Sequence, residues 1–288
     1  MAQQLFPNQT GQYNALQFNT GVYGLGAVTS MVSTASGEAI GFNDFGLQNS
    51  VYHTLFQHEI APSRELQFQP IPRFDGRVLN FEAWRNRTIK LSGIIVKNSL
   101  VTLEQEIDIF KKNIRGVNGN LDIEFAGGIR RYTATAGTIN IPREHYHIDW
   151  CAFEVIFECE SPFGSDVGYT SQSEGAFTAS VFPVVQDNDG TEDGELEVIM
   201  GFISAVGVSV VEIENLTRGE KMTISETITA GDILFVNGKN KEALLNLTPV
   251  DFTGFFPGLD VGENNLKITV TSTSHSYDVT VRHKNLFL

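Results

Sequence analysis

The sequence predicts a mainly β protein of two domains with a single helix, on three observations. The chain has 288 residues, enough for two domains at roughly 100–200 residues each. Only one segment, near residues 102–115, repeats its apolar residues with a helical period. Short apolar runs separated by Gly and Asn turns fill the C-terminal part.

The composition indicates a folded chain with an acidic surface. Hydrophobic residues make up 41% and charged residues 19%, which argues against disorder. The formal net charge of −14 opposes binding to nucleic-acid phosphates or to anionic lipid. The charge is uneven: residues 60–143 hold 13 basic and 8 acidic side chains, whereas residues 162–288 hold 7 and 18. One basic stretch therefore lies in an acidic molecule.

The first segment, residues 1–41, is rich in Gln, Asn, Gly, Ser and Thr and can bury little apolar surface by itself. We expect an N-terminal arm that becomes ordered only on assembly. Residues 86–96 follow the alternation of a strand, with Ile89, Leu91 and Ile95 on one face.

Residues 102–115 carry the start and stop signals of a helix. Thr102 is the expected N-cap, with Gln105 three residues later, and Gly116 follows the last turn. One apolar stripe faces a predicted sheet, formed by Leu103, Ile107, Phe110 and Ile114.

Three strands follow the helix, at residues 121–125, 129–141 and 148–160. In the last of them, one face carries only apolar residues and the other carries Glu154 and Glu158, which predicts a sheet with one covered side. The strand stops at Ser161-Pro162-Phe163-Gly164, and the composition then turns polar. We place the boundary between the two domains there.

The C-terminal part reads as a β-sandwich, because short strands follow one another without a helical period. Its turns contain Gly231, Gly238 and Gly262, as positive φ angles require. A largely apolar stretch, residues 198–211, is shorter than the ~20 residues that span a bilayer, and we interpret it as a further buried strand. The other expected strands are residues 208–214, 221–228, 232–236, 242–247, 266–273 and 277–281.

The two cysteines, Cys151 and Cys159, lie in one predicted strand, where about 3.3 Å per residue holds them roughly 26 Å apart. They cannot form a disulfide with each other there. We expect two buried thiols in a protein made in a reducing cytoplasm, and residues 1–10 lack the charge and apolar core of a secretion signal.

No motif predicts catalysis or a cofactor. His145 and His147 could bind a metal as a pair, but a zinc site needs further ligands at matched spacing. Residues 187–194 resemble a calcium loop, yet the Gly falls at the wrong position, and an exposed acidic turn is the preferred interpretation. Glu154, Glu158 and Glu160 could pair as glycosidase carboxylates, but side by side on one strand they are typical of a solvated face, and the sequence shows no aromatic cleft to hold a sugar. We therefore expect no enzyme, no cofactor and no metal.

Taken together, several segments resemble the distal tail proteins of long, non-contractile-tailed bacteriophages. The resemblance covers residues 42–288. In the first domain it is carried by residues 41–47, 71–77, 87–95, the helix and Phe157–Gly164. In the second domain it is carried by residues 213–219, 231–238, 256–259 and 262–264.

The resemblance implies two domains: a ring-forming domain with a sheet and a helix at 42–164, and a galectin-like β-sandwich at 165–288. The N-terminal arm at residues 1–41 precedes the part that the resemblance covers. It also implies a homohexameric ring in the virion, assembled in the host cytoplasm. Such a ring connects the tail tube to tail-tip and host-recognition proteins. DNA passes through the ring without specific binding, and the protein is not expected to insert into a membrane.

Within the basic stretch, we expect five residues at the ring interface: Arg73, Asp75, Arg77, Trp84 and Arg87. The alternative interpretation of this stretch is a solvated charged face. An alternative function is a carbohydrate-binding adhesin that acts through the C-terminal sandwich. Residues 162–288 contain no Trp that could stack on a sugar, so the resemblance is not extended to carbohydrate binding.

Overall fold

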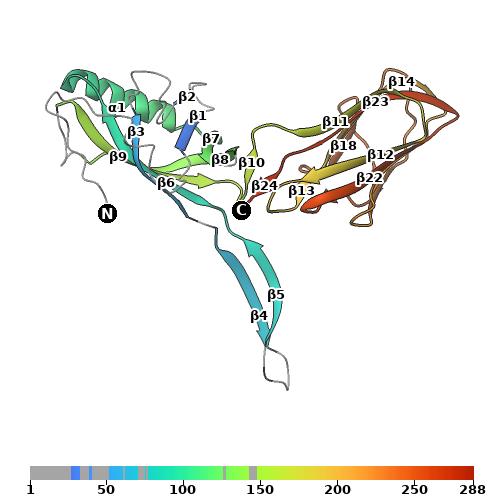
Figure 1. The fold of residues 1–288 in the computed structure, drawn as a ribbon, viewed down its shortest axis with the longest axis horizontal. Helices are drawn as coiled ribbons and strands as arrows, with labels where there is room; N and C mark the ends of the chain where they lie inside the picture. Colours follow the sequence, from blue (N-terminus) through green and yellow to red (C-terminus); the bar gives the residue numbers. More distant parts are fainter. Residues whose placement is uncertain are drawn as a thin grey trace. The chain divides into compact units, whose positions relative to one another are not determined.

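A computed structural model describes residues 27–32, 39–40, 52–60, 62–70, 75, 77–125, 128–142 and 148–288. It divides the chain into two compact units, Met1–Gly164 and Ser165–Leu288 (Figure 1). The mainly β architecture with one α-helix is confirmed in these residues. Among them, no helix is both long and apolar enough to cross a bilayer.

Unit 1 contains an antiparallel sheet with the strand order β2-β1-β7-β8-β9-β6-β3. Neighbouring strands β6 and β9 pair over their whole length, with Leu91 opposite Val155. The strands are β1 (Ala27–Val32), β2 (Ala39–Ile40), β3 (Tyr52–Ile60), β6 (Thr88–Val96), β7 (Gly119–Phe125), β8 (Gly128–Asn140) and β9 (Trp150–Cys159).

Helix α1 (Leu100–Ile114) covers one face of this sheet. All four residues of the predicted apolar stripe are buried, and the Phe110 ring lies 4.9 Å from the ring of Phe153 on β9. The apolar face of β9 is buried beneath it, while Glu154 on the other face pairs with Lys90 at 2.7 Å. The predicted sheet with one covered side is confirmed.

The predicted N-cap of α1 is wrong. Ser99 caps the helix: its side-chain oxygen accepts a hydrogen bond from the Thr102 backbone N–H at 3.3 Å. The helix begins at Leu100, earlier than predicted. The prediction missed Leu100 and Val101 because both are exposed. Their apolar side chains therefore do not follow the buried stripe on which the prediction was based.

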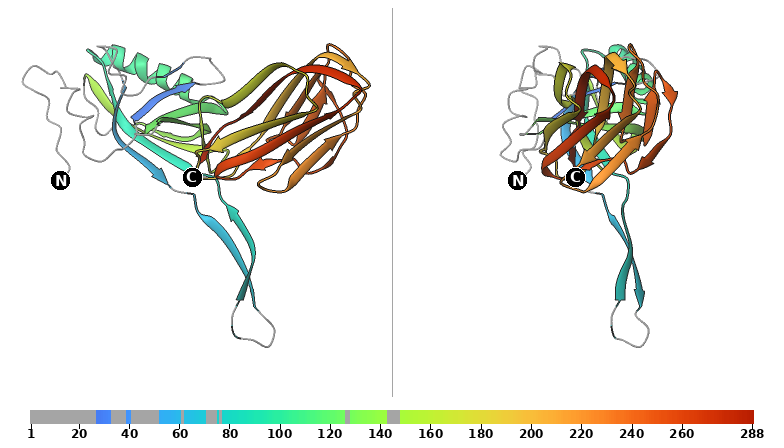
Figure 2. Two further views of the ribbon diagram at one scale, coloured as in Figure 1. Left: turned by 45° about the vertical axis from the view of Figure 1, so that its right-hand side comes forward. Right: turned by 90° about the vertical axis from the view of Figure 1, so that its right-hand side faces the viewer.

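A separate two-stranded ribbon also belongs to unit 1. Strands β4 (Arg64–Pro70) and β5 (Arg77–Trp84) form an antiparallel sheet of their own. Figures 1 and 2 show this ribbon extending away from the larger sheet of the unit. We call β4 and β5 the arm hairpin.

Unit 2 is a sandwich of two antiparallel sheets, with strand orders β11-β23-β14-β17-β18-β19 and β12-β22-β15-β16-β20. Met200 from the first sheet and Ile213 and Ile268 from the second belong to one buried core. The strands of the first sheet are β11 (Thr170–Phe177), β14 (Glu197–Val206), β17 (Ile233–Asn237), β18 (Glu242–Leu245), β19 (Thr248–Pro249) and β23 (Ser274–His283). Those of the second are β12 (Val181–Asn188), β15 (Val210–Asn215), β16 (Glu220–Ile224), β20 (Phe252–Gly254) and β22 (Gly262–Thr271).

The remaining strands are short. β13 (Gly194–Glu195) pairs with β21 (Gly258–Leu259), and β10 (Gly164–Asp166) pairs with β24 (Leu286–Phe287). The sandwich prediction is confirmed, but strands β11 and β12 were not predicted. β11 is polar and almost fully exposed, and β12 contains Pro183, which a strand tolerates at a sheet edge.

The turn glycines of unit 2 serve different purposes. Gly231 and Gly262 have φ angles of 91° and 92°, as predicted. The prediction of a positive φ at Gly238 is wrong. In the same turn it is Lys241 that has a positive φ, of 55°. Gly238 is needed for space instead, because a Cβ there would lie 2.8 Å from the Leu196 carbonyl oxygen.

Candidate functional site

The arm hairpin exposes apolar side chains that have no core to cover them. Phe68 lies directly opposite Leu79, and Leu66 precedes Phe68 by two residues, so these three share one face of the ribbon. Phe81 lies opposite Gln67, beyond a shift in the register of the two strands. Five large apolar residues of the hairpin are between 43% and 55% exposed: Leu66, Phe68, Val78, Leu79 and Phe81. Exposed apolar residues gathered on one element mark an interaction surface.

Three of the predicted interface residues lie on or beside this hairpin. Asp75 is exposed in the connection between the strands, and Arg77 is exposed at the start of β5. Trp84 ends β5, where the Arg64 guanidinium lies 4.6 Å above its ring. Arg64 also pairs with Glu82, so the base of the hairpin is held by side chains of both strands. Arg73 lies outside the described residues.

Arg87 has a different environment. Its side chain is 2% exposed, and its Nη1 donates a hydrogen bond of 2.8 Å to the hydroxyl of Tyr132, which is also buried. Its carbonyl oxygen accepts a hydrogen bond from the Cys159 N–H at 2.9 Å, which ties its backbone to the end of β9. Within one subunit Arg87 is therefore part of the packed interior, and the interface proposal below does not include it.

Part of the basic stretch is neutralised within unit 1. Arg131 makes two hydrogen bonds of 2.7 Å to the carboxylate of Asp122, and these bonds raise the pKa of Arg131. Lys97 pairs with Glu106 at 2.8 Å. The positive balance of residues 60–143 thus contributes less to the surface than the residue counts suggest.

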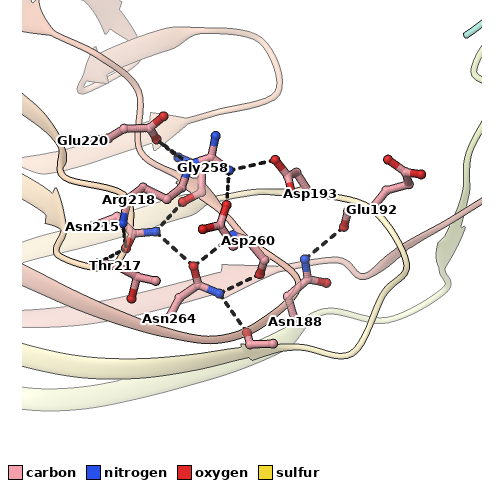
Figure 3. A network of polar contacts seen from close by, with 11 residues as sticks. Asn188, Glu192, Asp193, Asn215, Thr217, Arg218, Glu220, Gly258, Asp260 and Asn264 are labelled. Atoms are coloured by element: carbon pink, nitrogen blue, oxygen red, sulfur yellow. Dashed lines mark hydrogen bonds and ion pairs between the residues drawn. The ribbon is translucent and has the colours of Figure 1, made fainter.

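In unit 2, three of the four segments that carry the family resemblance, residues 213–219, 256–259 and 262–264, meet in one polar cluster (Figure 3). Asn215 ends β15, and its side-chain oxygen accepts hydrogen bonds from the backbone N–H groups of Thr217 and Arg218. Its amide group donates to the Gly258 carbonyl at 2.6 Å and to Asn264 Oδ1 at 3.1 Å. Both asparagine side chains are fully buried, so these bonds fix the loops on either side of them.

Arg218 lies among three carboxylates in this cluster, as Figure 3 shows. Its guanidinium contacts Asp193 at 2.9 Å, Asp260 at 2.7 Å and Glu220 at 3.1 Å. The hydrogen bond to Asp193 is the largest cause of a raised pKa of Arg218. We call Arg218 and these three carboxylates the arginine clasp. The clasp joins three loops that are distant in sequence.

The described residues offer little for catalysis. They contain no group of three or more His, Cys, Asp or Glu side chains that could hold a metal ion. Both cysteines are buried and free of disulfide bonds, and burial raises the pKa of the Cys159 thiol to about 12. Asp193, from the calcium-like segment, pairs with Arg218 instead. His145 and His147 lie outside the described residues.

An exposed aromatic ring in unit 2 bears on carbohydrate binding. Tyr169 is 45% exposed, but the cationic groups of Arg282 and Lys284 lie 4.2 Å and 4.8 Å from its ring centre. A sugar that stacked on that ring would compete with these cations. The geometry therefore gives the adhesin alternative no support at this ring.

The apolar residues of the arm hairpin were not predicted from the sequence as a site. Leu66 and Phe68 alternate with Gln67 and Gln69, which is the pattern of a strand with one covered face. The pattern could have revealed the strand. It could not reveal that these apolar side chains are exposed, because periodicity describes the strand and not what packs on it.

Comparisons with known proteins agree with this picture. Residues 189–287 match the family model described as the siphovirus-type tail component, C-terminal domain. No curated protein sequence matches the chain.

Two solved structures align with most of this chain. The Dit protein of phage SPP1, described as a paradigm of the hub adsorption apparatus in phages that infect Gram-positive bacteria, aligns with a TM-score of 0.63 and 13% identity. The alignment covers 90% of this chain and 99% of that protein. A chain of the phage P2 baseplate, in its activated conformation with Ca, aligns with a TM-score of 0.48 and 8% identity, over 89% and 97% of the two chains. The family model over residues 189–287 and the fold shared with the SPP1 protein confirm the resemblance of this chain to phage tail proteins.

Proposed function

We propose that this chain is a structural component of the tip of a siphovirus-type tail, where copies of it close into a ring. The ring would connect the tail tube to the tail-tip and host-recognition proteins. The family match of residues 189–287 and the fold shared with the SPP1 hub protein support a place in the tail. The chain would act through contacts with other proteins and not through catalysis.

The arm hairpin is the observation that supports self-association. An isolated two-stranded ribbon is marginally stable in water, and this one adds the exposed side chains of Phe68, Leu79 and Phe81. A second copy of the chain would cover them. If each subunit offers one hairpin and one receiving surface, the contact is head-to-tail, and a rotation that closes produces a ring.

The family resemblance also supports a proposal for the number of copies in the ring and for the place where the ring is found. We propose six copies per ring, located in the virion and assembled in the host cytoplasm. DNA would pass through the ring without specific binding, and the net charge of −14 would limit adhesion of the phosphates to its wall.

Size-exclusion chromatography with light scattering tests the ring. We expect a particle with six times the 31.8 kDa mass of one chain and an annular outline in negative-stain images. A chain that stays monomeric at high concentration would contradict the proposal, and so would an oligomer whose subunits form an open filament.

A hairpin variant tests which surface makes the contact. The double variant F68E/F81E replaces two exposed aromatic side chains of the ribbon with charges, and we expect it to be monomeric where the wild-type chain forms rings, because buried aromatic anchors each contribute about 2 kcal/mol or more to an interface. The control is Val117→Glu, at a residue of the same unit that is 61% exposed. Rings that persist in the double variant would exclude the hairpin as the interface.

A further inference from the structure

The two outer faces of the unit 2 sandwich differ in chemistry. The outer face of the β12-β22-β15-β16-β20 sheet carries ion pairs between neighbouring strands. Lys221 contacts Glu212 at 2.5 Å, and Lys267 contacts Glu214 at 2.6 Å. Exposed apolar residues of this face, Val181 and Val185, lie on its edge strand β12, whereas the central strands present these solvated pairs.

The outer face of the other sheet carries a row of apolar residues. Ile199 on β14 lies directly opposite Phe235 on β17, which lies directly opposite Leu244 on β18. Ile233 precedes Phe235 by two residues on β17, so it lies on the same face, where it is 52% exposed. We call Ile199, Ile233, Phe235 and Leu244 the apolar strip.

The strip lies outside the sandwich core. The residues that alternate with it, Val198 and Val236, belong to the buried core cluster, whereas none of the four strip residues does. Gly201 lies opposite Ile233, and a Cβ added to Gly201 would have no atom within 4 Å. The strip therefore has a shallow gap beside Ile233 that a partner's side chain could fill.

The edge of this sheet at strand β19 is a poorer docking site for a partner protein than the apolar strip. Edge strand β19 consists of Thr248 and Pro249 only. A short strand that contains proline offers few backbone groups to an added strand. Recognition here would use the face of the sheet.

The border of the strip is acidic. Glu197 and Glu242 each lie two residues from a strip residue on the same strand, Asp278 lies opposite Gly201, and Asp232 precedes Ile233. Glu197 is bound to Arg282 at 2.8 Å, which leaves a surplus of negative charge. Two copies of this face packed together would bring these acids against their equivalents, which is unfavourable.

We propose that the apolar strip docks a protein other than this chain, with a complementary apolar ridge bordered by Lys and Arg side chains. Burial of the strip would supply affinity, and the opposite charges at the border would orient the partner. This proposal rests on the proposed function, because it places the partner in the same tail.

Photo-crosslinking in assembled tails tests the docking. The probe is benzoylphenylalanine at position 235, where it replaces a similar aromatic side chain, and the matched control carries it at Thr223 on the outer face of the other sheet. After irradiation, mass spectrometry identifies what is attached. We expect position 235 to link to a different protein, at a site with Lys or Arg nearby, and position 223 to give little product.

Three outcomes would overturn the proposal: links from position 235 only to this chain, equal yields at both positions, or no link in tails that contain the chain. If an immunoblot finds no chain in the tails, the proposed function itself fails.

Charge reversal at the border gives a second readout. E242K together with D278K should lower the crosslink yield from position 235 about fivefold, because the border would then repel a basic partner. Glu263→Lys, on β22 of the other sheet, should leave the yield unchanged. Equal yields from the two charge-reversed proteins would exclude an electrostatic role of the border.

Discussion

The substitution Gly164→Ala adds a single methyl group, yet it should destabilise unit 1 strongly. A Cβ at residue 164 would lie 2.6 Å from Cζ and 2.8 Å from the hydroxyl oxygen of Tyr132, whereas ordinary contacts begin near 3.4 Å. Tyr132 is 1% exposed, so its ring has no free space into which to move. The ring would also be displaced from Arg87, which donates the hydrogen bond of 2.8 Å.

Two costs add in this variant. Overpacking of a core costs about 1–3 kcal/mol, and weakening a buried hydrogen bond to a charged group costs up to about 1.5–3 kcal/mol. We expect a loss of about 2–4 kcal/mol in the free energy of unfolding. For a unit of this size that corresponds to about 5–15 °C in Tm.

Tryptophan fluorescence during thermal unfolding is the appropriate assay, because both tryptophans, Trp84 and Trp150, lie in unit 1. Gly137→Ala is the matched control in the same unit, since a Cβ there would lie 3.4 Å from its nearest neighbour, the Glu158 side chain, which is an ordinary contact. A G164A protein within about 0.5 kcal/mol of the control would refute the reasoning and imply that the Tyr132 ring has room to move.

Three further predictions concern unit 2. Arg218→Met should lower its free energy of unfolding by about 1–2 kcal/mol, because three carboxylates lose their shared cation; urea unfolding followed by circular dichroism measures this, and R218K should recover part of the loss. Leu247→Gly should raise stability by about 0.5–1 kcal/mol, since Leu247 has a φ of 66° and is 88% exposed; a lower urea midpoint would contradict this. Burial lowers the pKa of His283 in the folded unit. As the pH falls below about 6.5, the unfolded chain therefore binds a proton that the folded unit does not bind. The free energy of unfolding should decrease with falling pH until the pH reaches the lower pKa of the folded unit. Urea midpoints at several pH values, compared with those of His283→Asn, test the last prediction.

The fold could be predicted from the sequence wherever the buried residues of an element recur with its period. The stripe from Leu103 to Ile114 and the alternating face of β9 are both buried, because a single apolar face decides their orientation. The helix start was misplaced because the signal at Ser99 precedes two exposed apolar residues. Local patterns do not tell an exposed Leu100 from a buried one.

The candidate site was less accessible, because it depends on contacts between distant segments. Arg87 belonged to the predicted interface as one of several arginines, and only the fold brings it to Tyr132, 45 residues away. The arginine clasp joins Asp193, Arg218 and Asp260, which no spacing rule connects. The apolar strip, likewise, depends on which strands are neighbours in the sheet.

The arm hairpin has a consequence for how this protein can change over time. Its exposed side chains contribute little to the packed interior of unit 1, so under the proposed function replacements there would alter association while the rest of the subunit keeps its structure. Stability and partner choice can therefore be selected independently, and a related tail could acquire a new neighbour through a few substitutions on one ribbon.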